Sequence, residues 1–153
     1  MVCYTGTGVA RTVPHSLGVA PELIIVKSRS IDNTWTVWSA PTGNSKFLTL
    51  NLPDAQGNSG GTVWGTGPSS TGFYVGVDGT LNASTATYVA YLFASLPGIS
   101  KVGFYTGNGS TQTINCGFTT GARFILIKRT DSTGDWYVWD TARGIVSAND
   151  PHL

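Results

Sequence analysis

The sequence predicts an all-β chain whose antiparallel strands form a sandwich or a barrel. Its apolar runs are short and rich in β-branched and aromatic residues, and turn residues interrupt them roughly every 8–12 positions. No stretch keeps the apolar period of 3.6 residues that an amphipathic helix needs. Glycine accounts for 20 of the 153 residues, as expected for a chain with many turns.

The expected strands fall into two groups along the chain. Residues 23–26 (Leu-Ile-Ile-Val) and 124–127 (Phe-Ile-Leu-Ile) are apolar at every position, so each predicts a central strand buried on both faces. Polar turns at 30–33 and 131–134 join these strands to tryptophan-containing strands, which predicts two β-hairpins. The expected strands of the first group are 2–5, 11–14, 22–28, 34–39, 46–50, 62–65, 72–77 and 87–94, and those of the second are 101–106, 112–115, 123–129 and 136–140.

The chain repeats part of itself. Residues 4–40 align without a gap with residues 105–141, and 10 of the 37 aligned pairs are identical, whereas chance would give roughly two or three. The repeat predicts a first β-sandwich module at 1–98 and a partial second module at 99–153. A single domain that contains a partial internal duplication is the alternative, because the repeated unit is too short to bury a core alone. The identical pairs are Tyr4/Tyr105, Thr5/Thr106, Gly6/Gly107, Gly8/Gly109, Thr12/Thr113, Ile24/Ile125, Lys27/Lys128, Trp35/Trp136, Val37/Val138 and Trp38/Trp139.

The composition excludes several functional classes. Charged residues make up 11% of the chain and the net charge is +1, with no acidic or basic run, so we expect no tight electrostatic binding to nucleic acid or to an anionic membrane. Low charge with abundant Gly, Thr, Ser and aromatic residues is typical of extracellular or virion β-proteins.

No segment is long and apolar enough for a membrane helix, and the first residues lack the pattern of a signal peptide. Cys3 and Cys116 do not align in the two copies, which predicts free thiols.

Catalytic and metal-binding patterns are poor. A glycosidase needs two carboxylates across one cleft. Glu22 is the only glutamate and aligns with Arg123, while Asp32, Asp131 and Asp135 fall in or beside the hairpin turns, where aspartate is common for conformational reasons. Two histidines without ligand spacing predict no metal site. We therefore expect a protein that is not an enzyme and that uses no cofactor.

The tryptophan pairs are the candidate ligand-binding residues. Residues three apart in a strand point to opposite faces, so one tryptophan of each pair should enter the core while the other faces outward. An outward tryptophan beside polar residues could stack against the apolar face of a sugar. The candidates are Trp35, Trp38, Trp136, Trp139 and Asp135. The alternative, which we favour, is that a loop or an adjacent module covers the outer ring.

A long stretch of small residues occupies positions 54–70. Two glycine- and serine-rich segments there flank a short apolar piece around Trp64. Loops of this length are either functional or plain surface, and the composition favours plain surface.

Several motifs resemble the repeated β-sandwich modules of bacteriophage virion and tail-fibre proteins, which are common in marine phages and in prophages. The resemblance is carried by Tyr-Thr-Gly-Asn-Gly-Ser-Thr-Gln-Thr-Ile-Asn-Cys-Gly-Phe at 105–118 and by the segment 123–143. The first copy is similar at 17–27, 35–38 and 86–94. In that pattern a module continues for several strands beyond the position equivalent to 153.

The resemblance implies a lectin-like, jelly-roll or concanavalin-like sandwich without known catalytic residues. It implies a structural or adhesion module of a virion, of tail-fibre or decoration type, that contributes to host-surface or glycan recognition. The alternative function is a carbohydrate-active enzyme or its accessory carbohydrate-binding domain. Expected partners are other virion chains in a homo-oligomer such as a trimer, and a cell-surface glycan. The expected location is the virion, assembled in the host cytoplasm and exposed to the medium.

Overall fold

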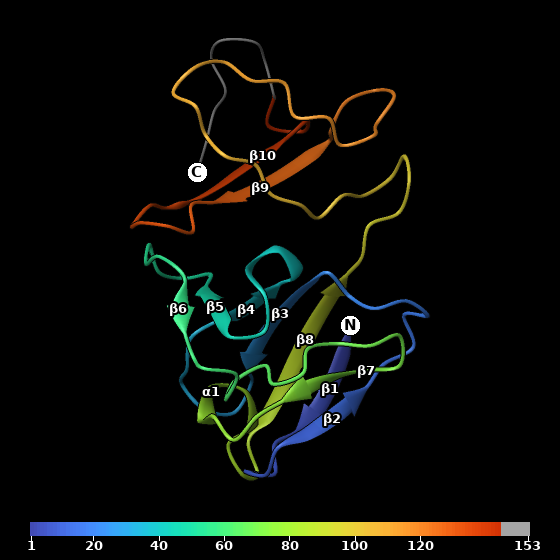
Figure 1. Ribbon diagram of the computed structural model, residues 1–153. Helices are drawn as coiled ribbons and strands as arrows, with labels where there is room; N and C mark the ends of the chain where they lie inside the picture. Colours follow the sequence, from blue (N-terminus) through green and yellow to red (C-terminus); the bar gives the residue numbers. More distant parts are fainter. Residues whose placement is uncertain (145–153) are drawn as a thin grey trace.

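The structure, a computed structural model that describes residues 1–144, is built almost entirely of antiparallel strands (Figure 1). The predicted all-β class is therefore confirmed. The largest sheet has six strands in the order β1-β8-β3-β4-β5-β6. A second sheet pairs β2 with β7, and a third pairs β9 with β10. The strands of the six-stranded sheet are β1 (Val2–Thr5), β8 (Thr87–Phe93), β3 (Leu23–Ser28), β4 (Thr36–Ser39), β5 (Lys46–Thr49) and β6 (Gly57–Asn58).

The first two sheets pack face to face as a sandwich. Strands β2 (Arg11–Pro14) and β7 (Gly72–Val75) lie across the six-stranded sheet (Figure 1). Apolar side chains from both sheets form one core, because alternate residues of each strand point inward. In β3, Ile24 and Val26 are fully buried, whereas Leu23 and Ile25 on the other face are only partly covered. The expectation that this strand is buried on both faces is thus wrong for its outer face.

Two short segments close the open end of the sandwich beside β4, β5 and β6. Helix α1 (Gly79–Asn82) follows β7, and a turn at 61–66 stands where the sequence predicts a strand at 62–65. The turn still delivers Val63 and Trp64 to the core. Gly76 holds the turn against β7, since its backbone N–H donates to Val63 O at 2.9 Å and a Cβ there would lie 1.6 Å from Thr62 O. Only glycine, which has no Cβ, allows the backbone of residue 76 to approach the turn this closely.

Asn82 fixes the loops at the end of the sandwich. Its side chain is fully buried; Nδ2 donates to Val9 O at 2.8 Å and to Gly76 O at 2.7 Å, and Oδ1 accepts from Thr7 N at 2.9 Å. A buried amide is stable only when its donors and acceptors are satisfied in this way. The position of α1 is therefore determined by polar as well as apolar contacts.

The second hairpin reproduces the first in detail. Strands β9 (Phe124–Lys128) and β10 (Trp136–Asp140) pair in the register of β3 and β4 shifted by 101 residues, so that Ile125 lies opposite Trp139 just as Ile24 lies opposite Trp38. Thr141 N donates to Arg123 O at 3.0 Å, as Ala40 N donates to Glu22 O at 2.8 Å. Shared register and closing hydrogen bonds confirm the expected pair of equivalent hairpins.

The rest of the second copy does not repeat the strands of the first. Residues 101–106 and 112–115, predicted as strands, are not strands. Their counterparts β1 and β2 are held by β8 and β7, whereas residues 101–106 and 112–115 pair with no strand among residues 1–144. A strand without a partner leaves its backbone groups unpaired, which explains the difference. The division into modules at 1–98 and 99–153 stays a prediction.

Candidate functional site

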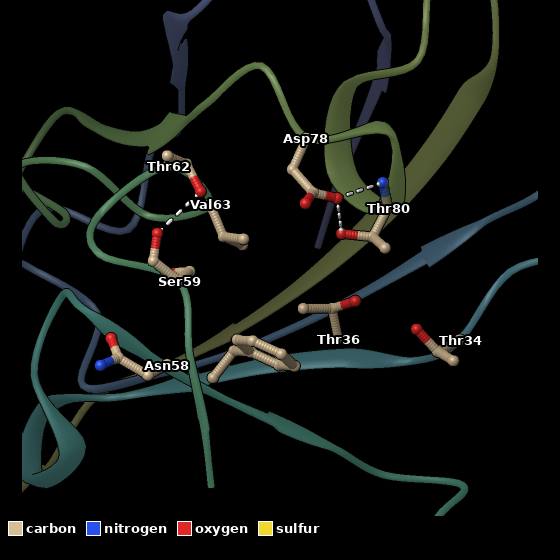
Figure 2. Close-up of a pocket in the computed structure, with 9 residues that line it drawn as sticks. Thr34, Thr36, Asn58, Ser59, Thr62, Val63, Asp78 and Thr80 are labelled. Atoms are coloured by element: carbon tan, nitrogen blue, oxygen red, sulfur yellow. Dashed lines mark hydrogen bonds between the residues drawn. The ribbon is translucent and has the colours of Figure 1, made fainter.

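A polar cavity opens at the end of the sandwich, between the six-stranded sheet and the segments that close it (Figure 2). Its volume is about 320 Å³. Strands β4 and β5 form one wall, and the turn before β7 and helix α1 form the opposite wall. The lining residues are Thr34, Thr36, Phe47, Asn58, Ser59, Thr62, Val63, Asp78 and Thr80.

The backbone turns order one side of the cavity. Asp78 caps helix α1: its Oδ1 accepts from Thr80 N at 2.8 Å and from Thr80 Oγ1 at 2.6 Å. Across the cavity, Ser59 O accepts from Thr62 Oγ1 at 2.8 Å, and Asn58 Oδ1 accepts from Gly60 N at 3.0 Å. These contacts leave Asp78 Oδ2 without a hydrogen-bond partner in the described part of the chain. Figure 2 shows Asp78 and Thr80 facing Thr36 and Thr34 across the opening.

The strand wall of the cavity carries Thr36 and Phe47. Thr36 is 2% exposed, and its hydroxyl has no hydrogen-bond partner among residues 1–144. Phe47 packs on the edge of the core. Its ring lies against Gly57 of β6, so close that a Cβ on residue 57 would come within 2.3 Å of it. The wall thus combines an apolar ring with unused hydroxyl groups.

The sequence analysis did not predict this cavity. Its lining comes from segments as distant as Thr34 and Thr80, which no local pattern connects. Asn58, Ser59, Thr62 and Val63 belong to the small-residue stretch at 54–70, where the composition favoured plain surface.

The first tryptophan pair divides between the two faces of β4, as predicted. Trp38 is 5% exposed, lies in the core and donates from Nε1 to Asn44 Oδ1 at 3.2 Å. Trp35 lies on the outer face, where it is partly buried and stacks on Tyr91 with 6.5 Å between ring centroids. Its outer position agrees with the stacking hypothesis, although Tyr91 already occupies part of its surface.

The second pair lies on the second hairpin. Trp136 is partly buried and donates from Nε1 to Thr49 O at 2.8 Å, so it contacts strand β5 of the sandwich. Trp139 stacks on Tyr137, with 5.6 Å between centroids and 11° between ring planes. Asp135 is exposed. Within residues 1–144, no ring contact joins the two tryptophan pairs, so the five predicted residues do not form one site.

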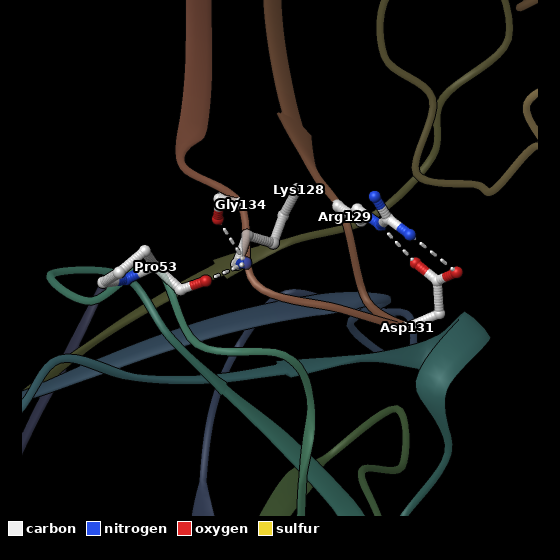
Figure 3. Close-up of polar contacts among 5 residues, drawn as sticks. All are labelled: Pro53, Lys128, Arg129, Asp131 and Gly134. Atoms are coloured by element: carbon white, nitrogen blue, oxygen red, sulfur yellow. Dashed lines mark hydrogen bonds and ion pairs between the residues drawn. The ribbon is translucent and has the colours of Figure 1, made fainter. Parts of the chain in front are cut away.

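The second hairpin is fixed to the sandwich by contacts with the loop after β5 (Figure 3). Lys128 Nζ donates to Pro53 O at 3.1 Å and to Gly134 O at 2.6 Å. Gly134 N donates to the same Pro53 oxygen at 2.8 Å, and Gln56 N donates to Thr130 O at 3.0 Å. We call these contacts, together with the Trp136–Thr49 bond, the hairpin joint. Partial burial lowers the pKa of Lys128, and the nearby Asp54 and Asp135 oppose that shift.

A family model described as a domain of unknown function (DUF7483) matches residues 1–151. The chain belongs to this family. No curated protein and no solved structure matches it. The match covers both hairpins and the hairpin joint, so a DUF7483 domain includes the second hairpin.

The carboxylates of this DUF7483 domain are mostly occupied by local contacts. Glu22 accepts hydrogen bonds from the backbone and hydroxyl of Ser95. Asp131 pairs with Arg129 at 2.7 Å and Asp140 with Arg143 at 2.5 Å, and these partners lower the pKa of both carboxyls. In the described residues no group of three His, Cys, Asp or Glu could hold a metal ion, and no helix is long and apolar enough to cross a membrane. Cys3 and Cys116 are free, as expected.

Proposed function

We propose that this chain is a non-enzymatic structural and adhesion module of a bacteriophage virion, of tail-fibre or decoration type, that contributes to host-surface or glycan recognition. Its partners are other virion chains, in a homo-oligomer such as a trimer, and a glycan of the host surface. The motifs that resemble phage tail-fibre modules suggest this role, and the hairpin joint supports it.

The hairpin joint is the observation that carries the proposal. A second copy of a hairpin is held on the first module by Lys128, by Trp136 and by backbone groups of both partners. Backbone hydrogen bonds fix orientation without depending on a particular side chain. A fibre built of tandem modules needs such a joint, because neighbouring modules must keep a defined angle. A single catalytic site, in contrast, needs no second copy of the hairpin.

The surface chemistry agrees with exposure to the medium. Only 11% of the residues are charged and the net charge is +1. Glycans carry few charges in many cases, and their recognition depends on hydroxyl and aromatic groups rather than on a strong field.

Analysis of virions tests the proposal directly. Particles of the phage or induced prophage that carries the gene are purified on a density gradient and their proteins identified by mass spectrometry. We expect the chain, or a longer product containing it, in the particle fraction, with antibody labelling at the tail or on the capsid. Its presence only in the soluble lysate, with none in particles, would overturn the virion role.

An accessory carbohydrate-binding domain of an enzyme is the second candidate, and the polar cavity is the observation that favours it. In the part of the chain that the structure describes, Asp78 is the only carboxylate that lines the cavity, whereas a glycosidase needs a pair. The two functions predict different partners, since an accessory domain accompanies a glycosidase chain whereas a virion module is part of the particle. Co-purification with a glycosidase chain instead of with particles would favour the accessory domain.

A further inference from the structure

We propose that the polar cavity between β4, β5 and α1 binds one neutral sugar residue of a glycan. This inference rests on the recognition role proposed above and places that role at a site away from the tryptophan pairs. Four observations carry it: unused polar atoms, an aromatic wall, the size of the cavity and its charge.

The polar atoms that face the cavity have hydrogen-bonding capacity to spare. Thr36 is 2% exposed, yet its hydroxyl has no partner in residues 1–144. The hydroxyl of Thr34 and Asp78 Oδ2 are also without a partner there. None of these oxygens belongs to the fully buried unpaired atoms of the described residues, so they remain accessible from the cavity. A ligand with several hydroxyl groups can pair with all of them at once.

The ring of Phe47 supplies the apolar half of the site. Sugars have apolar C–H faces as well as hydroxyl edges, and aromatic rings pack against those faces. Gly57 leaves the space into which the ring extends, since a side chain there would displace it. The ring and the threonine hydroxyls therefore lie on the same wall, where one small ligand can contact both.

Size and chemistry limit the ligand further. A volume of about 320 Å³ is at the lower end of the range for small-molecule sites and suits one sugar ring with its substituents. One sugar hydroxyl can donate to Asp78 Oδ2 while another accepts from a threonine hydroxyl. A purely apolar ligand would leave these polar atoms unpaired.

Charge excludes acidic ligands. Among residues 1–144, no Lys, Arg or His lines the cavity, and Asp78 is the only ionisable residue in its lining. A sialic acid, a uronic acid or a phosphate would lie beside this carboxylate without a compensating cation. The site therefore favours neutral hexoses and N-acetylhexosamines.

Titration of the full ¹⁵N-labelled chain, followed by NMR, tests the proposal. The probes are the methyl glycosides of glucose, galactose, mannose and N-acetylglucosamine, with glucuronic acid and inorganic phosphate as anionic comparisons. For at least one neutral sugar we expect saturable shifts of the amides of Asn58, Ser59, Thr62 and Thr80. The indole N–H signals of Trp35, Trp136 and Trp139 should not move, and the anions should bind more weakly.

Asp78→Asn is the decisive variant. Asparagine caps a helix as well as aspartate does, so α1 should persist while the charged acceptor is lost. We expect the Kd of the responding sugar to rise about tenfold. Asp135→Asn is the matched control, since it removes an exposed carboxylate from the tryptophan-bearing hairpin and should leave the Kd unchanged.

Three results would overturn the cavity site. These are no saturable shift with any neutral sugar, shifts confined to the tryptophan indoles, or a loss of affinity in Asp135→Asn but not in Asp78→Asn. The virion test above does not depend on them. A chain found in particles that binds none of the sugars would refute the cavity site and leave the structural role standing.

Discussion

Tyr4 and Tyr88 stack inside the first module, with 5.1 Å between ring centroids. The Tyr4 hydroxyl donates to Leu81 O at 2.7 Å, and the Tyr88 hydroxyl donates to Gly79 O at 2.9 Å. Burial is the main cause that raises the pKa of both phenols above the ordinary value of 10.0. Both rings therefore stay neutral in the folded protein under alkaline conditions.

The two phenols make stability fall at high pH. Above pH 10 the unfolded chain loses these protons while the folded chain retains them, so the free energy of unfolding decreases as pH rises. We expect Tyr4→Phe to lower the free energy of unfolding by about 1 kcal/mol at neutral pH and to make the alkaline decline shallower. Urea unfolding from pH 8 to pH 11 measures both effects. Tyr105→Phe, at the exposed counterpart of Tyr4, is the control and should change neither; an equal slope in all three proteins would contradict the assignment.

Residue roles were predictable where one local rule decides them. The division of Trp35 and Trp38 between the two faces follows from the alternation of strand residues, whereas the spacing did not say which of the two rings enters the core. The cavity residues were not predictable in this way, because Thr36 and Asp78 are brought together only by the tertiary packing of α1 on the six-stranded sheet. A threonine in a strand also has high β-propensity, so its type carries no signal of binding.

Among the elements, Lys27 and Lys128 offer a matched pair of substitutions. Each ammonium binds a carbonyl within its own hairpin, that of Asn33 and that of Gly134 respectively. Only Lys128 also reaches Pro53 in the other module. The comparison therefore separates hairpin stability from the hairpin joint.

We expect Lys128→Met to loosen the joint. Loss of its hydrogen bonds should destabilise the docked hairpin by about 1–2 kcal/mol, and the amides of Gln56 and Gly134 should exchange hydrogen faster. Lys27→Met should leave the exchange of those two amides unchanged. Equal protection in Lys128→Met and the unaltered chain would show that the joint does not depend on this side chain.

The element predictions succeeded where apolar pattern and turn chemistry agreed. Both hairpins met this condition. At 62–65 the apolar pair Val63 and Trp64 suggested a strand, but the flanking glycines favour a turn, in which Gly65 N donates to Gly61 O at 2.8 Å. The two-residue strand β6 and the single turn of α1 are too short to produce a periodic pattern.

At the scale of the whole molecule, residues 1–144 cover the apolar face of the second hairpin only in part. Tyr137 is 40% exposed and Ile125, Ile127 and Trp139 are partly exposed, although the corresponding residues of the first hairpin are buried. Strand β9 also pairs only with β10 among the described strands, whereas β3 has β8 on its other edge. Such faces and edges promote association.

We therefore expect the chain to self-associate through this face as its concentration rises. Sedimentation velocity over a concentration series measures the association. Ile127→Arg should shift the distribution towards monomer, because a charge is costly to bury. Phe104→Arg, at an exposed position outside the hairpin, should not. A monomer at every concentration would contradict this expectation.

We also expect no hydrolysis of polysaccharides or esters. Asp140 pairs with Arg143, which lowers its pKa, whereas a general acid needs a raised one. Reducing-sugar assays with a polysaccharide panel measure turnover. Activity that disappears in Asp135→Asn or Asp140→Asn would prove this wrong.

The pairing of β1 with β8 has a mechanical consequence. Val2 lies opposite Ala90, so the chain passes into the sandwich and out of it at the same end, on adjacent strands (Figure 1). Tension applied between residues 1 and 94 would act in the unzipping geometry, in which the hydrogen bonds between the two strands break one after another. In the shear geometry all of these bonds would bear the load together. The core and the cavity would not transmit the force until β1 had peeled away. The sandwich therefore resists tension between residues 1 and 94 less well than a domain whose terminal strands are loaded in shear.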